Sequence, residues 1–343
     1  MCNKKFNEVA FLTTHNAYNS SQGNFSLPNQ NYNIVTQLNN GVRGLMLDVY
    51  DGFGTLLVYH GSQILGSQPF VDYLNQINTF LSNNSNEIVV LILECYADAN
   101  SIENVINQSG LNNYLYTHDS IQGWPSLQTM INNNERLVIF SDENDAGPNQ
   151  HWYHYVWDYA IETHYSVNNQ NDFTCDFNRG DSLNDLFIFN HFVTTPLGTG
   201  DENASLSANS NPFFWNRVLQ CQQEKNKFPN FITVDFYDLG NAHDVVNQLN
   251  EVANTIEESI GFSATNLKVF PNPSNQFINI ELGSKVEVPY SITIYSSIGK
   301  QLFFESNLLE KKIKIEYKLP KELCLIVVQD KNNELYTLSV INK

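Results

Sequence analysis

The sequence contains no apolar run that approaches the roughly 20 consecutive residues an α-helix needs to cross a lipid bilayer. This lack excludes a helical membrane span. Basic residues are also scarce, because 18 lysines and arginines face 36 aspartates and glutamates, which gives a formal net charge of −18. Proteins that bind nucleic acids need a basic surface to displace counterions from phosphate, so we expect no nucleic-acid partner.

Cysteine is scarce as well. The chain has five cysteines at widely separated positions and no pair with the CxxC spacing. This excludes a disulfide-rich scaffold and a metal site built from thiolates. Cys175 and Cys221 lie in loop-like sequence and are candidates for a disulfide in an exported protein, whereas Cys95 lies in an apolar run and is expected in the core.

Charge is distributed unevenly along the chain. Residues 1–267 hold 8 basic residues against 28 acidic ones, whereas residues 268–343 hold 10 lysines, no arginine and 8 acids. The later segment also alternates apolar and polar residues, with turn sequences such as NPSN, SSIG and KNN between the runs. We therefore expect a first domain over residues 1–257, a linker over 258–267 and a small antiparallel β-sandwich over 268–343.

Short apolar runs rich in β-branched residues recur in the first domain, separated by stretches with helical spacing. The predicted strands are 9–15, 42–50, 56–60, 88–96, 136–142, 186–192 and 231–237. The predicted covering helices are 68–84, 126–134 and 242–260. Most of the strands are apolar on consecutive positions, as in parallel sheets covered on both faces. The alternation of strands and helices predicts an α/β barrel or a doubly wound sheet.

Polar residues discriminate between these two folds. Nearly every predicted strand ends in a polar or ionisable side chain, at His15–Asn16, Asp48, His60, Glu94, Asp142, Asn190–His191 and Asp235. In a barrel of parallel strands these ends converge on one face, where the active sites of such barrels lie. The pattern therefore favours the barrel, with a functional site at that face.

His15 and His60 are the leading catalytic candidates. Moving a proton between two oxygen atoms needs an acid and a base that titrate near neutrality, and histidine is the usual residue for both. Two histidines at neighbouring strand ends suit phosphoryl or acyl transfer. A histidine at one strand end is equally well explained as a structural group, and this is the expected role of the other histidines.

Asn16, Asp48 and Glu94 are the candidate metal ligands. An amide oxygen and two carboxylates at strand ends suit a hard cation such as Ca²⁺ or Mg²⁺. Such a cation would neutralise the charge of a phosphate and acidify an attacking hydroxyl group. Asp235 is a candidate partner for His15, whose tautomer it would fix; a salt bridge from Asp235 to Arg43, or a loop cap, is the alternative.

Four segments together resemble the X domain of phosphatidylinositol-specific phospholipase C, most closely its single-domain branch in plants, fungi and bacteria. They are LTTHNAY (12–18), QLNNGVRGLMLDVYDG (37–52), LVYHG (57–61) and IVVLILECY (88–96). The resemblance extends over residues 5–255. It implies an irregular TIM-type (β/α) barrel in which His15 and His60 act as general base and acid and Asp235 orients His15.

The same resemblance implies a metal site, with two departures. The calcium-dependent animal members use ligands that match Asn16, Asp48 and Glu94, together with an acidic residue where this chain has Met46. The metal-independent bacterial members have an arginine where this chain has Tyr50. Because the chain has three oxygen ligands and lacks that arginine, we expect a metal-using enzyme, with Ca²⁺ preferred over Mg²⁺.

The implied reaction is intramolecular. The 2-hydroxyl group of an inositol ring attacks the neighbouring phosphorus, and a cyclic inositol phosphate and diacylglycerol result. The first domain has only 8 basic residues, which disfavours polyphosphorylated inositides. The expected substrate is a phosphatidylinositol-like lipid or its soluble phosphodiester head group. Residues 195–215 are predicted as a long surface loop, whose aromatic end is a candidate for transient contact with a membrane surface.

The C-terminal segment has a resemblance of its own. LKVFPNPSNQFINIEL (267–282), ITIYSSIGKQLF (292–303) and LYTLSVINK (335–343) resemble the C-terminal sorting domain of the type IX secretion system of Bacteroidetes-type bacteria. This implies export by the secretion machinery to the cell surface or the medium. An ordinary accessory β-module is the alternative. We expect the protein to be a monomer.

The sequence is also compatible with two other functions. One is a phosphodiesterase that acts on glycerophosphodiesters or other lipids, although such enzymes normally begin with His-Arg-Gly where this chain has THNAY. The other is a barrel that binds lipid or carbohydrate without catalysis. Met46, in place of an acidic ligand, favours the second function, and the two histidines speak against it.

Overall fold

The computed structural model describes residues 1–195, 199–260, 267–270, 277–283, 286–296, 301–316, 319, 323–332 and 335–341. The chain divides into two compact units, Met1–Val252 and Ala253–Lys343. Of the predicted linker, residues 258–260 belong to a helix, 261–266 lie outside the described residues, and Leu267 begins a strand. Within the described ranges, no helix combines the length and the apolar character needed to cross a membrane.

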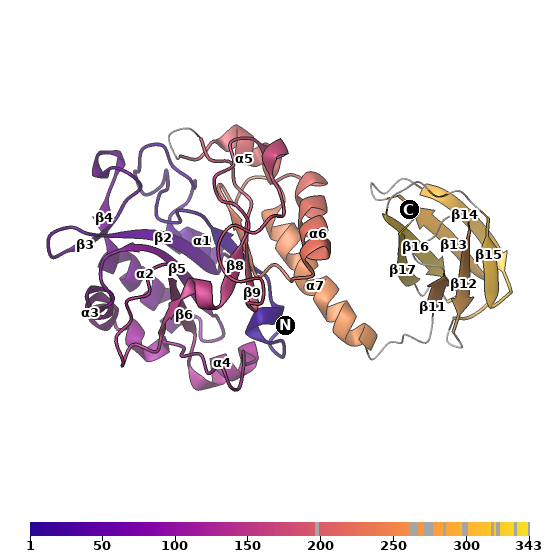
Figure 1. Ribbon diagram of the computed structural model, residues 1–343, viewed down its shortest axis with the longest axis horizontal. Helices are drawn as coiled ribbons and strands as arrows, with labels where there is room; N and C mark the ends of the chain where they lie inside the picture. The colour runs from indigo at the N-terminus through magenta and orange to yellow at the C-terminus, as the bar shows by residue number, and fades with distance from the viewer. Residues whose placement is uncertain are drawn as a thin grey trace. The chain divides into compact units, whose positions relative to one another are not determined.

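Eight parallel strands form the sheet of the first unit (Figure 1). They are β1 (Phe11–Thr14), β2 (Gly44–Asp51), β5 (Val89–Tyr96), β6 (Leu137–Ser141), β7 (Tyr153–Tyr155), β8 (Ala160–Glu162), β9 (Leu186–Asn190) and β10 (Phe231–Val234). Their order is β7-β6-β5-β2-β1-β10-β9-β8, so the last strand lies beside the first. Within the described residues of the first unit, 1–195 and 199–252, no strand pairing joins β7 to β8. The barrel is therefore open between these two strands. The predicted irregular barrel is confirmed.

One predicted barrel strand is wrong. The run at 56–60 forms β3 (Leu56–Val58), which pairs antiparallel with β2 and with the short β4 (Gln68–Pro69). Only four residues connect β2 to β3, too few for the crossover that parallel neighbours require. The result is a hairpin that extends β2 and brings the chain back towards the barrel mouth.

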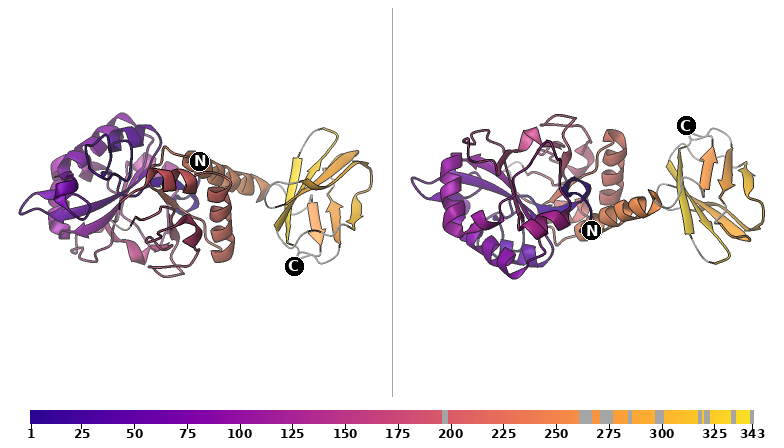
Figure 2. Two further views of the ribbon diagram at one scale, coloured as in Figure 1. Left: turned by 90° about the horizontal axis from the view of Figure 1, so that it is seen from above. Right: turned by 90° about the horizontal axis from the view of Figure 1, so that it is seen from below.

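The described residues form seven helices. Those of the barrel lie outside the sheet (Figures 1 and 2). The seven helices are α1 (Ile34–Asn39), α2 (Phe70–Asn83), α3 (Ala99–Ser109), α4 (Leu127–Asn133), α5 (Glu202–Ala208), α6 (Phe213–Lys225) and α7 (Ala242–Ile260). Short 3-10 turns occur at Phe6–Glu8, Gln63–Leu65, Leu111–Tyr114, Val156–Asp158 and Gln170–Asp172. Local sequence determines where some of the α-helices begin. The side chains of Asp98 and Ser126 cap the first turns of α3 and α4, as short polar side chains do.

The predicted loop at 195–215 is also wrong. Its described part contains α5 and the start of α6, and Phe214 is fully buried against the barrel. Within the aromatic end, Phe214 therefore packs in the core, whereas Phe213 and Trp215 are partly exposed. The membrane contact stays a prediction.

The barrel interior is filled from its amino-terminal end by aromatic rings. Phe6 stacks on Trp124 with 4.9 Å between ring centroids, and Phe11 and Phe140 lie 5.9 and 6.0 Å from Phe231. Alternate strand residues point outwards and pack under the helices in a second core. Because the aromatic rings close one end of the barrel, its polar cavity lies towards the other.

The described strands of the second unit form two antiparallel sheets. One contains β11 (Leu267–Phe270), β12 (Ile278–Leu282) and β15 (Lys312–Ile315) in the order β11-β12-β15. The other contains β13 (Tyr290–Tyr295), β14 (Gln301–Leu308), β16 (Leu323–Gln329) and β17 (Leu335–Ile341) in the order β14-β13-β16-β17. Apolar side chains of both sheets share one core, as expected for a β-sandwich.

Candidate active site

His15 is paired with Asp235 at the mouth of the barrel. His15 directly follows β1 and Asp235 directly follows β10, the neighbouring parallel strand. The His15 Nδ1 atom lies 2.9 Å from Oδ1 of Asp235, which is almost completely buried. The imidazole ring also stacks on Phe192 with 3.8 Å between centroids. Both contacts fix the ring and leave its Nε2 atom available.

His60 is paired with Asp48 in a similar way. The hairpin of β2 and β3 places His60 Nδ1 at 3.0 Å from Oδ2 of Asp48, which lies in β2. The hydrogen bond to Asp48 raises the pKa of His60 above its ordinary value of 6.5, and partial burial opposes this shift only in part. The His60 side chain is 30% exposed, so its Nε2 atom remains accessible to a ligand.

Asn29 connects the two histidine–aspartate pairs, and its role was not predicted from the sequence. Its Nδ2 atom donates to Oδ2 of Asp235 at 3.1 Å, and its Oδ1 atom accepts from Nδ2 of Asn16 at 3.3 Å. The Asn16 Nδ2 atom in turn lies 3.4 Å from Nδ1 of His60, and because that Nδ1–H group donates to Asp48, this is a packing contact and not a second hydrogen bond. A continuous chain of contacts therefore runs from His15 through Asp235, Asn29 and Asn16 to His60.

Backbone geometry supports this arrangement. Asn16, directly after His15, has φ +46°, and Phe236, directly after Asp235, has φ +45°. The left-handed region costs a non-glycine residue energy, so the surrounding contacts must hold these turns. The Phe236 N–H group donates to the carbonyl oxygen of Asn29 at 2.8 Å. The same segment thus holds both the turn after β10 and the side chain of Asp235.

Asp48, Glu94 and His15 line one cavity of about 70 Å³, whose lining does not include His60 or Asn16. Asp48 and Glu94 are register partners on β2 and β5. Glu94 is exposed and accepts a hydrogen bond from the Tyr96 hydroxyl group. Tyr96 stacks on Tyr50 with 4.4 Å between centroids, so Tyr50, at the position where the metal-independent members have an arginine, supports Glu94 indirectly.

Three further charged residues line the same cavity and were not predicted as site residues: Asp142, Glu162 and Arg179. The pKa of Asp142 is raised to about 6, chiefly by burial and also by the charge of Glu94, while Arg179 partly offsets the shift. Arg179 donates through Nε to Glu162 at 2.6 Å. Arg179 is one of only 8 basic residues in the first domain, and this scarcity is the sequence signal that could have drawn attention to it.

The predicted metal ligands fit a cation only in part. Within the ranges the structure describes, no group of three or more histidine, cysteine, aspartate and glutamate side chains is arranged to hold a metal ion. Asp48 and Glu94 share the cavity, but the Oδ1 atom of Asn16 accepts from the Tyr18 hydroxyl group at 3.4 Å. The carboxylates of Asp48 and Glu94 could therefore bind one cation in the cavity, whereas the amide oxygen of Asn16 is hydrogen-bonded to Tyr18 instead.

Other histidines and cysteines behave as expected. His191 is completely buried and stacks on Phe214 at 3.8 Å, and burial lowers its pKa well below 6.5. Burial also lowers the pKa of His154 to about 4. The predicted Cys175–Cys221 disulfide is present, and Cys95 is buried in the core. Neither His191 nor His154 belongs to the site.

Comparisons with known proteins agree with this architecture. Residues 1–250 match the sequence model of the family described as PI-PLC X 1, and residues 268–342 match that of the secretion system C-terminal sorting domain. The phosphatidylinositol-specific phospholipase C from Listeria monocytogenes has a similar fold, with a TM-score of 0.50 and 15% identity, over 73% of this chain and 95% of that enzyme.

Two curated relatives share more sequence. A PI-PLC X domain-containing protein of Arabidopsis thaliana is 28% identical over 271 residues, which are 71% of this chain and 62% of the relative. An uncharacterized secreted protein of Arthroderma benhamiae is 26% identical over 283 residues, 74% of this chain and 62% of the relative. The matched region thus spans less than two thirds of each relative. The sorting domain marks the chain as a secreted protein of the type IX system of Bacteroidetes. By its match over residues 1–250, the chain belongs to the PI-PLC X family.

Proposed function

We propose that the protein is a secreted phosphodiesterase that cleaves phosphatidylinositol-like substrates by a two-histidine mechanism. The single observation that carries this proposal is the pair of histidine–aspartate contacts, 2.9 Å at His15 and 3.0 Å at His60, joined through Asn29 at the open end of the barrel. Each aspartate engages Nδ1 and leaves Nε2 for a substrate. This is the arrangement that proton transfer in both directions requires.

His15 is proposed as the general base. With its Nδ1–H group donating to Asp235, the neutral imidazole has its lone pair on Nε2. In the proposed reaction this atom takes the proton from the 2-hydroxyl group of the inositol ring. The hydroxyl oxygen forms a bond to the neighbouring phosphorus, an intramolecular attack with a large proximity advantage.

His60 is proposed as the general acid. Asp48 raises its pKa, so a larger fraction of His60 is protonated near neutrality than in an unperturbed histidine. As the bond between phosphorus and the diacylglycerol oxygen breaks, His60 gives its proton to that oxygen. The products are diacylglycerol and a cyclic inositol phosphate, which the reversed roles of the two histidines would hydrolyse with water.

The substrate is proposed to carry one phosphate group, in the phosphodiester itself. The cavity is lined by four carboxylates and one arginine, which disfavours an inositol ring with further phosphates. The acidic first domain also disfavours strongly anionic bilayers. A phosphatidylinositol-like lipid and a soluble glycerophosphoinositol are therefore the two substrates to compare.

A divalent cation, Ca²⁺ before Mg²⁺, remains a proposal. Asp48 and Glu94 would hold it, because they share the cavity and leave an excess of negative charge there. A bound cation would supply positive charge next to the phosphate. Asn16 would join these ligands only if its amide turned away from Tyr18.

A phosphorus-NMR assay on phosphatidylinositol and on glycerophosphoinositol tests the proposal, with Ca²⁺ and with chelator. We expect a cyclic phosphate product from the wild type and none from His15→Ala or His60→Ala, with little change in the melting temperature of either variant. A variant that lacks one histidine and cleaves at the wild-type rate would refute the mechanism. Cleavage of glycerophosphodiesters without inositol, or binding without cleavage, would favour the two other functions considered above.

A further inference from the structure

We propose that Arg179 binds the phosphate group of the substrate, and that the Cys175–Cys221 disulfide holds the segment that presents Arg179 to the cavity. The inference rests on the proposed function. It starts from the composition of the cavity lining, in which Arg179 is the one lysine or arginine among the described residues. An anionic substrate that enters this cavity meets four carboxylates and one guanidinium group.

The guanidinium group of Arg179 is fixed but not fully used. Its Nε atom donates to Oε1 of Glu162 at 2.6 Å, and its Cζ atom lies 4.3 Å from the ring centre of Trp157 and 4.7 Å from that of Tyr165. Within the described ranges, neither Nη group donates to another residue. The arginine side chain is 41% exposed, while the Glu162 side chain is 3% exposed. The two Nη groups, with four N–H bonds between them, are therefore left for a ligand in a preset orientation, which suits a phosphate.

The backbone of the segment is tied to β8 beside the cavity. The Glu162 N–H group donates to the Arg179 carbonyl oxygen at 3.1 Å, and the Asn178 N–H group donates to the Glu162 carbonyl oxygen at 2.9 Å. Gly180 allows this close approach: it has φ +86°, and a Cβ atom there would lie 2.1 Å from the carbonyl oxygen of Ala160. The position of Arg179 relative to β8 is thus set by its neighbours on both sides.

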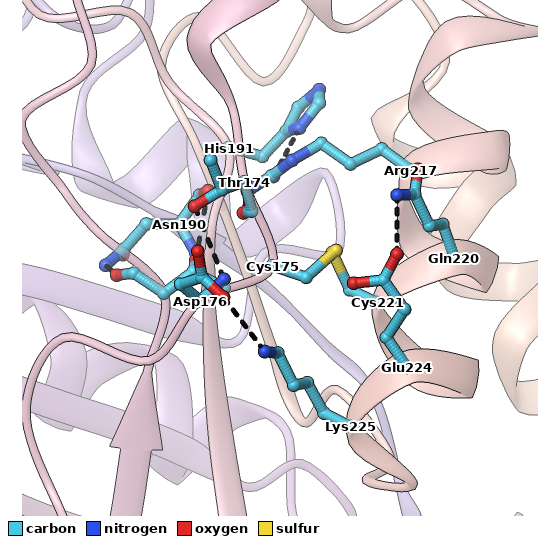
Figure 3. The surroundings of a disulfide bond; sticks show 11 residues. Thr174, Cys175, Asp176, Asn190, His191, Arg217, Gln220, Cys221, Glu224 and Lys225 are labelled. Atoms are coloured by element: carbon cyan, nitrogen blue, oxygen red, sulfur yellow. Dashed lines mark hydrogen bonds and ion pairs between the residues drawn. A yellow bond between two sulfur atoms is a disulfide. The ribbon is translucent and has the colours of Figure 1, made fainter.

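The disulfide ties the same segment to α6, four residues before Arg179 (Figure 3). Figure 3 shows the Cys175–Cys221 bond and, beside it, the ion pair between Asp176 and Lys225, whose charged atoms lie 3.1 Å apart. The carbonyl oxygen of Thr174 accepts from Arg217 at 3.0 Å. This segment, residues 174–180, otherwise contains no helix and no strand. Its order therefore depends on these attachments.

Arg179→Gln is the direct test, with Arg179→Lys as the conservative variant. Hydrogen bonds to charged groups contribute about 1.5–3 kcal/mol, so we expect kcat/KM to fall by about tenfold to a hundredfold in Arg179→Gln and by less in Arg179→Lys. Inorganic phosphate should inhibit the wild type competitively and the Arg179→Gln variant much more weakly. Arg43→Gln is the matched control, because Arg43 also donates through Nε to a carboxylate, Glu87, but lies before β2 at the other end of the barrel.

The disulfide is tested by a double-mutant cycle on the full chain. Replacing both cysteines with serine should lower kcat/KM in the wild-type background. In the Arg179→Gln background it should change kcat/KM little, because the guanidinium group that the disulfide positions is then absent. The milder Lys225→Met variant, which removes the ion pair with Asp176 and the contact of the ammonium group with the Phe177 ring, should show the same pattern at smaller amplitude. Unfolding midpoints measured for every variant separate this coupling from a general loss of stability.

The outcomes separate this inference from the proposed function. A wild type without phosphodiesterase activity on any substrate would overturn the proposed function. An active wild type whose Arg179→Gln variant keeps its kcat/KM and its inhibition by phosphate would overturn the role of Arg179 alone. Losses in the cysteine and Arg179 variants that add in full would overturn the role of the disulfide.

Discussion

Asn29→Ala is the most informative single substitution, because Asn29 is the residue that joins the two histidine–aspartate pairs. Its side chain is fully buried and donates to Asp235 at 3.1 Å, while it accepts from Asn16 at 3.3 Å and from Asn19 at 2.7 Å. Alanine removes all three hydrogen bonds. Asn16 and Asn19 each keep another contact, so the Oδ2 atom of Asp235 suffers the clearest loss.

The expected stability cost follows from these contacts. A hydrogen bond to a charged group contributes about 1.5–3 kcal/mol and a bond between neutral groups about 1 kcal/mol. The free energy of unfolding of the first unit should therefore fall by about 3.5–5 kcal/mol. The four tryptophans all lie in that unit, so their fluorescence during urea denaturation reports on it alone; they are Trp124, Trp152, Trp157 and Trp215.

The expected catalytic cost is separate from the loss of stability. Without Asn29, the carboxylate of Asp235 and the amide of Asn16 lose the group that fixes their relative positions, and with them the positions of His15 and His60. A small displacement of catalytic groups can cost about a hundredfold in rate. We expect a loss of this size in kcat/KM, measured at a temperature and urea concentration where the variant remains folded.

Asn230→Ala is the matched control. Asn230 is equally buried and its side chain also makes three hydrogen bonds, to the Phe187 N–H group at 3.0 Å and to the carbonyl oxygens of Asn7 and Val9 at 2.8 and 3.2 Å. It precedes β10, whereas Asp235 follows that strand. Both variants should lose similar stability. The reasoning is refuted if, in their folded states, both lose the same activity or neither loses any.

Three further predictions concern the charges of the site. Asp48→Asn removes the carboxylate charge that makes the hydrogen bond to His60 raise its pKa, so the alkaline limb of the kcat/KM profile should move to lower pH; an unmoved limb would contradict the role of His60 as the acid. Because Asp142 has a raised pKa, wild-type stability relative to Asp142→Asn should fall as pH rises from 3.8 to about 6 and stay constant above, as urea midpoints across that range will show. Tyr96→Phe frees Glu94, and if a cation binds there, the Ca²⁺ concentration for half-maximal activity should change while the chelator-treated rate stays the same.

The sequence predicted the barrel because its signal is local and repeated. Each predicted buried strand, such as 88–96, is a nearly continuous apolar run, which is typical of a parallel strand covered on both faces. Nearly every run also ends in a polar residue. It did not predict β7 or β8, which have three residues each, because such short strands carry no period that distinguishes them from loops. The loop predicted at 195–215 failed for a related reason, since α5 has only seven residues.

The sequence located some of the charged residues that line the candidate site and missed others, together with the contacts that connect them, and the roles of the residues it named stay predictions. His15, Asp48 and Asp235 follow or end apolar strands, so the strand pattern alone located them at one face. Asn29 lies in an irregular segment between β1 and α1, and its importance comes from contacts 206 residues apart in the chain, which no local pattern encodes. Arg179 was missed for the same reason, because its partners Glu162, Trp157 and Tyr165 lie 14 or more residues before it in the chain.

The charge balance of the cavity connects these observations. Four carboxylates and one guanidinium group line about 70 Å³, and a bound phosphate would add another negative charge. An acidic residue in place of Met46 would add a fifth carboxylate to the same lining. The raised pKa of Asp142, about 6, lowers the net charge whenever that group is protonated, and a cation at Asp48 and Glu94 would lower it further. Activity in chelator should therefore decline less at pH 6 than at pH 8, because protonation of Asp142 then replaces part of the charge that the cation supplies. An equal decline at the two values would show that Asp142 does not share this role.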